Sequence, residues 1–131
     1  MKDKIVPLLI AVTLLGGMVL IFMSGSGPKT KPVHVNVPAL SAAAKAGEAV
    51  FNRNCARCHG INAAGTHHGP PLMHKYYLPN HHPDAAFYRA AAYGVRAHHW
   101  RFGNMPPIHT VKQKDVKQIL DYIRELQRAN F

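Results

Sequence analysis

The chain has 131 residues, of which 16 are Lys or Arg, 6 are Asp or Glu and 10 are His, so its formal net charge at pH 7 is +10. This length fits one small domain, and the two cysteines are too few for a disulfide framework or a four-cysteine zinc site. The basic charge does not predict nucleic-acid binding, because the chain shows no recognised nucleic-acid-binding motif.

The N-terminal region, residues 1–23, predicts one transmembrane helix that acts as an anchor. Residues 5–23 are uncharged for nineteen positions, enough for roughly 28 Å of helix, close to the thickness of a bilayer core. A cleaved signal peptide is the alternative, because Lys2 and Lys4 form a basic start and small residues follow at 24–26. The apolar run is longer than the roughly 7 to 15 residues of a signal peptide, which favours the uncleaved anchor.

Residues 24–40 predict a linker, because they read SGSGPKTKPVHVNVPAL, with three prolines and two glycines. As a linker, this stretch reaches roughly 20 Å if flexible and about 50 Å if fully extended. Valines alternate with polar residues from Val33 to Val37 as in a strand, but the flanking prolines equally favour an extended segment that lies on the domain.

The remaining domain, residues 41–131, predicts an all-α fold. Apolar residues at helical spacing predict a first helix over about 42–54 and a last helix over about 112–129. A middle helix is predicted between Pro83, at its first position, and Gly94, just past its end. Three helices with long loops leave a small core, so a bound group is expected to supply much of the buried apolar surface.

The last predicted helix has the clearest amphipathic pattern. Thr110 and Gln113 form a candidate capping box, although a start two residues later also fits. One face carries an apolar stripe made of Val116, Ile119, Leu120, Ile123 and Leu126.

The most specific motif is Cys55-Ala56-Arg57-Cys58-His59, which uses both cysteines of the chain. Cys-x-x-Cys-His is the spacing that attaches a c-type haem. The two thiols reach the two vinyl groups of one porphyrin, and the imidazole of His59 lies under the iron. A thioredoxin-like pair is less favoured, because no alternation of strands and helices surrounds the motif. A zinc site completed by distant histidines is equally disfavoured.

At these residues the domain resembles the class I cytochrome c family, and the resemblance extends from about Ser41 to the C-terminus. It implies a mostly helical fold in which the first and last helices cross closely at Gly47, against the face that contains Leu120 and Ile123. Four features carry it: Gly47 with Phe51, Cys55 to His59, Gly69-Pro70-Pro71-Leu72, and Gly103-Asn104-Met105-Pro106-Pro107.

The resemblance assigns His59 as the proximal iron ligand and Met105 as the distal one. A thioether is a soft neutral ligand that stabilises ferrous iron and raises the potential, and Pro106 stiffens the loop that presents it. The alternative for Met105 is packing on the porphyrin edge. Met73 is the only other methionine in the domain, and its place soon after His59 favours packing.

The resemblance also implies residues around the two ligands. The carbonyl of Pro70 is expected to accept a hydrogen bond from His59 Nδ1 and so to fix the ring. Leu72 is expected to lie on the porphyrin. Trp100 is expected to donate its indole N–H to a haem propionate, with packing in the core as an equal alternative.

Histidine pairs are a departure from this family pattern. Imidazoles that converge in space bind zinc or copper, so a second metal site is conceivable. The alternatives are helix caps, propionate partners, solvated surface, or one histidine in place of Met105 as distal ligand, which would lower the potential. The pairs are His67-His68, His81-His82 and His98-His99, with His34, His74 and His109 besides.

The positive charge predicts acidic partners. After residue 26 the chain has 14 Lys and Arg against 5 Asp and Glu, a formal +9 before two propionates are counted. Positive potential around a haem edge steers a protein toward acidic patches on redox partners, such as a quinol-cytochrome c reductase and a terminal oxidase or another oxidoreductase. Attraction to anionic lipid headgroups, or solubility alone, is the alternative.

Together these observations predict a non-enzymatic carrier of single electrons with one haem c attached through Cys55 and Cys58. It is expected at the bacterial inner membrane, with its haem domain in the periplasm, where c-type haem is attached in bacteria. Two alternatives stay open: a fixed haem subunit of a larger oxidoreductase complex, and a haem peroxidase or ligand sensor with a displaceable distal ligand.

Overall fold

The computed structural model of the protein describes Thr13 and residues 31–131. The predicted anchor over residues 1–23, Thr13 apart, and the first part of the predicted linker lie outside the described residues. Within the part that the structure describes, no helix is both long enough and apolar enough to cross a membrane.

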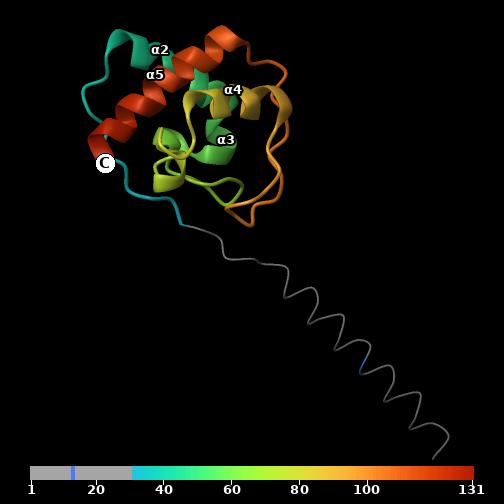
Figure 1. The fold of residues 1–131 in the computed structure, drawn as a ribbon. Helices are drawn as coiled ribbons and strands as arrows, with labels where there is room; N and C mark the ends of the chain where they lie inside the picture. The colour runs from blue at the N-terminus through green and yellow to red at the C-terminus, as the bar shows by residue number, and fades with distance from the viewer. Residues whose placement is uncertain (1–12, 14–30) are drawn as a thin grey trace, which may run out of the picture.

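The described domain is mostly helical, and helices α2, α4 and α5 form its frame (Figure 1). The described residues contain one isolated antiparallel bridge, between Val95 and Met105, and no longer strand. In chain order the elements are α2 Ala42–Asn54, α3 Ala56–His59, the short 3-10 helices η1 Ile61–Ala63 and η2 Lys75–Tyr77, α4 Asp84–Tyr93 and α5 Gln113–Asn130.

The predicted bounds of α2 agree with the structure, whereas α4 begins one residue later than predicted, because Pro83 lies at its N-cap and not at its first helical position. Ser41 precedes α2, and its Oγ accepts a hydrogen bond from the backbone N–H of Ala44 at 3.2 Å. Pro83 precedes α4, and Gly94 ends it with a positive φ of 75°.

The predicted capping box of Thr110 and Gln113 is wrong, and the alternative start two residues later is the one observed, because α5 begins at Gln113 after Lys112. Lys112 occupies the N-cap position, and its backbone N–H donates to Asp115 Oδ2 at 2.8 Å. The carboxylate also lies near the positive end of the helix dipole. Thr110 instead donates from Oγ1 to Asn54 Oδ1 at 3.4 Å.

Helices α2 and α5 cross at Gly47, as the family resemblance implies, but the opposing residues differ from those expected (Figure 1). A Cβ atom at Gly47 would lie 1.9 Å from the carbonyl oxygen of Gln118 and 3.0 Å from Cβ of Tyr122. Gln118 and Tyr122 share one side of α5, whereas Leu120 projects from the opposite side of a helix with 3.6 residues per turn. The close contact therefore involves Gln118 and Tyr122 rather than Leu120 and Ile123.

Residues 31–40 have no regular secondary structure and lie on the helical domain. The backbone N–H of Val33 donates to the carbonyl oxygen of Ala64 at 2.8 Å. Asn36 and Asn130 form two hydrogen bonds, at 2.9 Å and 2.8 Å. The side chains of Val33, Val35 and Leu40 pack against the core. This part of the predicted linker is thus an extended segment attached to the domain.

Candidate functional site

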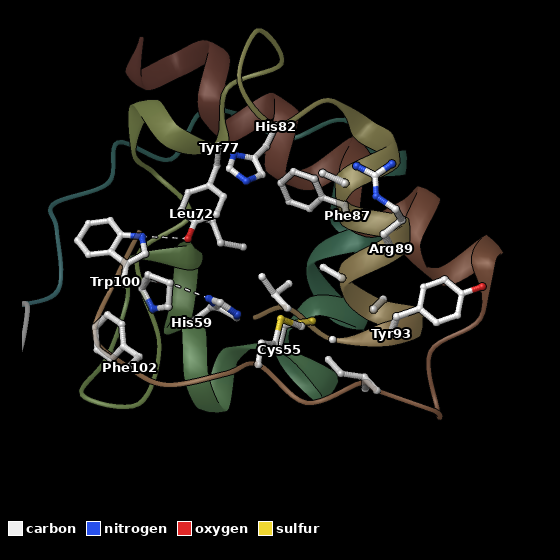
Figure 2. A pocket seen from close by; sticks show the side chains of 18 of the residues that line it. Cys55, His59, Leu72, Tyr77, His82, Phe87, Arg89, Tyr93, Trp100 and Phe102 are labelled. Atoms are coloured by element: carbon white, nitrogen blue, oxygen red, sulfur yellow. Dashed lines mark hydrogen bonds between the residues drawn. The ribbon is translucent and has the colours of Figure 1, made fainter. Parts of the chain in front are cut away.

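A cavity of about 600 Å³ lies at the centre of the domain, bordered by α2, α4, α5 and the loops between them (Figure 2). This volume falls within the usual range for cofactor sites, roughly 300–1,000 Å³. Its walls are mainly apolar and include Phe51, Leu72, Phe87, Ile108, Val111 and Ile119.

Cys55 immediately precedes α3, and Cys58 lies within this helix. Both follow directly after α2. Cys55 lines the cavity, and Cys58 is exposed and one helical turn further on. Burial, followed by the charge of Cys58, raises the pKa of the Cys55 thiol to about 11, so the thiol keeps its proton at neutral pH. Cys58 does not itself line the cavity, but residues at i and i+3 share one side of a helix, which is the spacing that attachment of both thiols to one planar group requires.

His59 enters the cavity from the end of α3 (Figure 2). Its Nδ1 lies 2.9 Å from the carbonyl oxygen of Pro70. Because a carbonyl oxygen only accepts, Nδ1 carries the proton and Nε2 keeps the lone pair that a metal needs. Burial lowers the pKa of His59, which favours the neutral ring.

The loop that carries Pro70 lies directly on α3. A Cβ atom at Gly69 would lie 2.8 Å from the carbonyl oxygen of Cys58. Thr66 donates from Oγ1 to the same carbonyl oxygen at 2.5 Å. Glycine at position 69 therefore lets the acceptor carbonyl of Pro70 come within reach of the His59 ring.

Met105 lines the same cavity as His59, from the loop before α5. Its backbone pairs with Val95 through two hydrogen bonds of 2.9 Å. A Cβ atom at Gly94 would lie 2.4 Å from the carbonyl oxygen of Met105, so glycine is required where this loop meets the end of α4. Met73, the rival methionine, is 5% exposed in the core and does not line the cavity.

Trp100 also lines the cavity, and its indole N–H donates to Tyr77 Oη at 3.1 Å (Figure 2). The expected donation from Trp100 to a propionate stays a prediction. Tyr77 was not singled out from the sequence, where nothing separates it from Tyr76. Burial raises the pKa of Tyr77 to about 12, so its O–H stays available as a hydrogen-bond donor at the cavity wall.

Two polar side chains of α5 hold the segment that carries Leu72 and Tyr77. Gln127 is buried, and its Nε2 donates to the carbonyl oxygens of Leu72 at 3.3 Å and Tyr77 at 3.0 Å. Arg124 donates to the carbonyl oxygens of Tyr77 at 2.7 Å and His82 at 2.9 Å. Sequence reasoning missed both residues, although Gln127 continues the apolar stripe of this helix at helical spacing.

The charged residues of the cavity wall are cationic. Arg89 and Arg96 line the cavity, and among the described residues no Asp or Glu does. A bound group with carboxylates at its edge would therefore meet positive charge.

Two of the three predicted histidine pairs, 81–82 and 98–99, meet in space. His81, His82 and His99 come together, with one ring nitrogen of each within 4.8 Å of the others. His67 and His68 are exposed and do not belong to this group.

These residues fit a covalently attached haem: two thiols on one helical turn, an imidazole with a free Nε2, a thioether, apolar walls and two arginines. The fold and the cavity define a small helical haem protein. A family model described as Cytochrome c matches residues 44–127.

The chain belongs to the cytochrome c family, and its cofactor is haem c attached through Cys55 and Cys58. This membership fits a haem-based electron carrier. No curated protein and no solved structure matches the chain.

Proposed function

We propose that the protein carries single electrons on a haem c whose iron has His59 and Met105 as axial ligands. The observation that supports this most directly is that both side chains line one cavity, although they come from segments far apart in the domain sequence. An imidazole and a thioether complete the coordination of haem iron and leave no open position for a substrate.

The chain supports electron transfer by holding both proposed ligands in place. The haem iron supplies the one-electron couple when bound. The hydrogen bond to Pro70 orients the His59 ring, and the pairing with Val95 fixes the backbone of Met105. Ligands held in this way change position little between oxidation states, which keeps the reorganisation that accompanies electron transfer small.

We further propose that the domain is tethered to the bacterial inner membrane and faces the periplasm. The apolar run of residues 5–23 supports the tether. The formal charge of +9 after residue 26 supports partners with acidic patches, such as a quinol-cytochrome c reductase and a terminal oxidase or another oxidoreductase.

The attached segment 31–40 favours a second candidate, a fixed haem subunit of a larger oxidoreductase complex. With this segment on the domain, only residues 24–30 separate it from the apolar run. Seven residues span at most about 25 Å, which limits how far a tethered domain can travel. Purification in mild detergent distinguishes the two, because a fixed subunit co-purifies with stable partners and a shuttle does not.

Optical spectra of the purified protein test the ligation and the rival role as peroxidase or sensor. The ferric protein should show the weak long-wavelength band of iron–thioether ligation, and the ferrous protein should not bind carbon monoxide. Met105→Leu should lose the band and bind carbon monoxide. Met73→Leu is the matched control and should keep the band. Carbon monoxide binding by the unmodified protein would instead indicate an open or displaceable position.

A further inference from the structure

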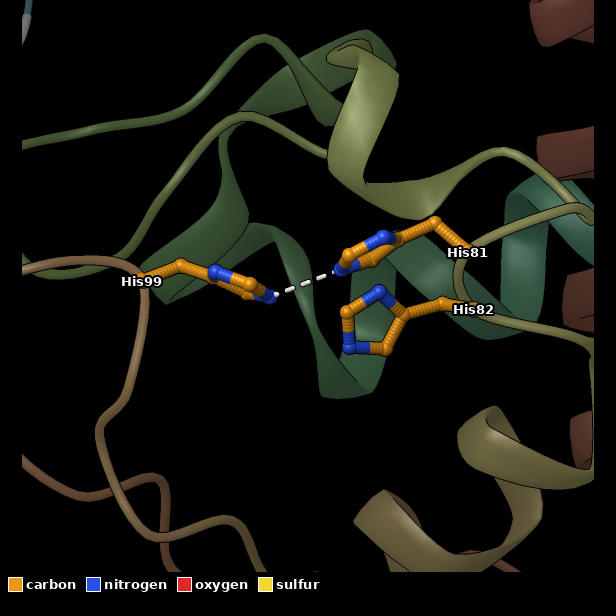
Figure 3. A group of neighbouring side chains, drawn as sticks. All are labelled: His81, His82 and His99. Carbon is orange, nitrogen blue, oxygen red and sulfur yellow. Dashed lines mark hydrogen bonds between the residues drawn. The ribbon is translucent and has the colours of Figure 1, made fainter.

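The group His81, His82 and His99 is the strongest unexplained feature of the domain (Figure 3). Two of the three lie in the turn before α4, and the third lies in the loop before Met105. These segments are seventeen residues apart in sequence, so only the tertiary structure brings the three rings together. One ring nitrogen of each lies within 4.8 Å of the other two.

The distance between the two closest rings suits a shared metal. Nε2 of His81 lies 3.2 Å from Nε2 of His99. Two imidazole nitrogens on one tetrahedral metal, each at about 2.0–2.1 Å, are about 3.3 Å apart. In the structure these two atoms face each other as a hydrogen-bonded pair, so one proton occupies the position between them. A metal there requires the Nδ1–H tautomer of both rings.

Tyr76 contacts His82 and His99 of the group. Nδ1 of His82 contacts the carbonyl oxygen of Tyr76, so Nδ1 carries the proton and Nε2 keeps a lone pair. The ring of His99 stacks on the ring of Tyr76, with centroids 4.2 Å apart and an interplanar angle of 17°. Outer contacts of this kind orient the ligands of metal sites before the metal arrives.

We propose that His81, His82 and His99 bind one divalent transition-metal ion of the copper and zinc class, separate from the haem iron. Three neutral imidazoles favour these metals over magnesium or calcium, which prefer oxygen ligands. A water molecule completes a four-coordinate ion. The binding itself does not depend on the proposed role in electron transport.

The position of the group also couples this ion to the haem. His82 and His99 belong to the histidine group and also line the haem cavity. A divalent charge at the cavity wall favours the less positive, ferrous state of the haem and so raises its reduction potential. By linkage, the ferrous protein binds the ion more tightly than the ferric protein by the same factor.

Zinc titration of the ferric holoprotein by calorimetry tests the site, because Zn²⁺ is redox-inert. The expected result is one ion per chain, with affinity reduced by at least about 100-fold in His81→Asn and in His99→Asn. The double variant His67→Asn/His68→Asn removes an exposed pair outside the group and should bind as the unmodified protein does. The proposal would be overturned if the unmodified protein did not bind zinc. It would also be overturned if the His67→Asn/His68→Asn control lost as much zinc affinity as His81→Asn and His99→Asn.

Haem spectra of all variants show whether each variant is folded and contains haem. The reduction potential is then measured with and without Zn²⁺. It should shift to a more positive value in the unmodified protein and stay constant in the double variant His81→Asn/His99→Asn. Zinc binding without any shift would disprove the coupling. Both readouts are independent of the spectra that test Met105, so the two proposals can fail separately.

Discussion

Arg124 donates from Nη2 to the carbonyl oxygen of His82 at 2.9 Å and thereby ties the turn before α4 to the last helix. The same guanidinium group pairs with Asp84 at 2.8 Å and donates to the carbonyl oxygen of Tyr77 at 2.7 Å. The wall of the haem cavity that carries Tyr77 and His82 is therefore positioned by a residue that does not line the cavity.

Replacement of Arg124 by leucine should destabilise the protein by about 2 kcal/mol or more, because hydrogen bonds to a charged group contribute about 1.5–3 kcal/mol and the carbonyl groups lose their donor. Urea unfolding of the holoprotein measures the loss. Arg128→Leu is the matched control, since Arg128 is exposed one turn further along the same helix. Equal effects of the two substitutions would show that the contacts of Arg124 do not matter for stability.

Gly47→Ala should destabilise the protein even though alanine is the better helix former by about 1 kcal/mol. The added methyl group would lie 1.9 Å from a backbone oxygen of α5, so the two helices must move apart. Overpacking of this kind costs typically 1–3 kcal/mol. We expect a net loss in thermal unfolding, whereas Ala46→Ser at the neighbouring exposed position should have little effect. A stabilised Gly47→Ala protein would contradict the close crossing.

Trp100 and Tyr77 should behave as a coupled pair, because the indole N–H has Tyr77 Oη as its hydrogen-bond acceptor. A double-mutant cycle with Trp100→Phe and Tyr77→Phe isolates this contact. We expect a coupling free energy of about 1 kcal/mol in urea unfolding. Strict additivity of the two substitutions would show that Trp100 acts through packing alone.

Alkaline conditions should destabilise the domain through Tyr122. This residue is fully buried, and burial, followed by the charge of Glu48, raises its pKa to about 12, above its ordinary value of about 10. Between these values the unfolded state has lost a proton that the folded state keeps, so the free energy of unfolding falls as the pH rises from about 10 to 12.

Unfolding at pH 9 and pH 11 measures this effect. The decrease between the two values should be smaller in Tyr122→Phe than in the unmodified protein. Tyr93→Phe, at a position 82% exposed, is the control and should keep the full decrease. An unchanged decrease in Tyr122→Phe would assign the alkaline loss to other groups.

The cationic cavity wall should control electron exchange with small charged reagents. Oxidation of the ferrous protein by the ferricyanide anion should slow as salt is added, because screening weakens the attraction. Oxidation by a hexaammine cobalt(III) cation should quicken under the same change. Arg96→Gln should slow oxidation by ferricyanide. Arg128→Gln, at a position outside the cavity lining, should change that rate less. Stopped-flow absorbance measures both rates.

Much of the local structure was predictable because it depends on residues close in sequence. Ser41 begins α2 and Gly94 ends α4, each through a contact within one helical turn. At α5 the local pattern left two starts open, and the structure has the later one, where Asp115 accepts a hydrogen bond from the backbone N–H of Lys112. The pairing of Gly47 with Gln118 and Tyr122 depends on the rotation of two helices about their axes, which no local pattern specifies.

Haem attachment at Cys55 and Cys58 could be predicted from the sequence, because thioether formation requires a fixed spacing along one helical turn. The sequence also indicated the family, through motifs that each occupy a few consecutive residues. Three features follow only from the packing of the domain: the attachment of residues 31–40, the anchoring of the cavity wall by Arg124 and Gln127, and the meeting of His81 and His82 with His99. These features join residues far apart in the chain, and such contacts depend on how the whole domain packs.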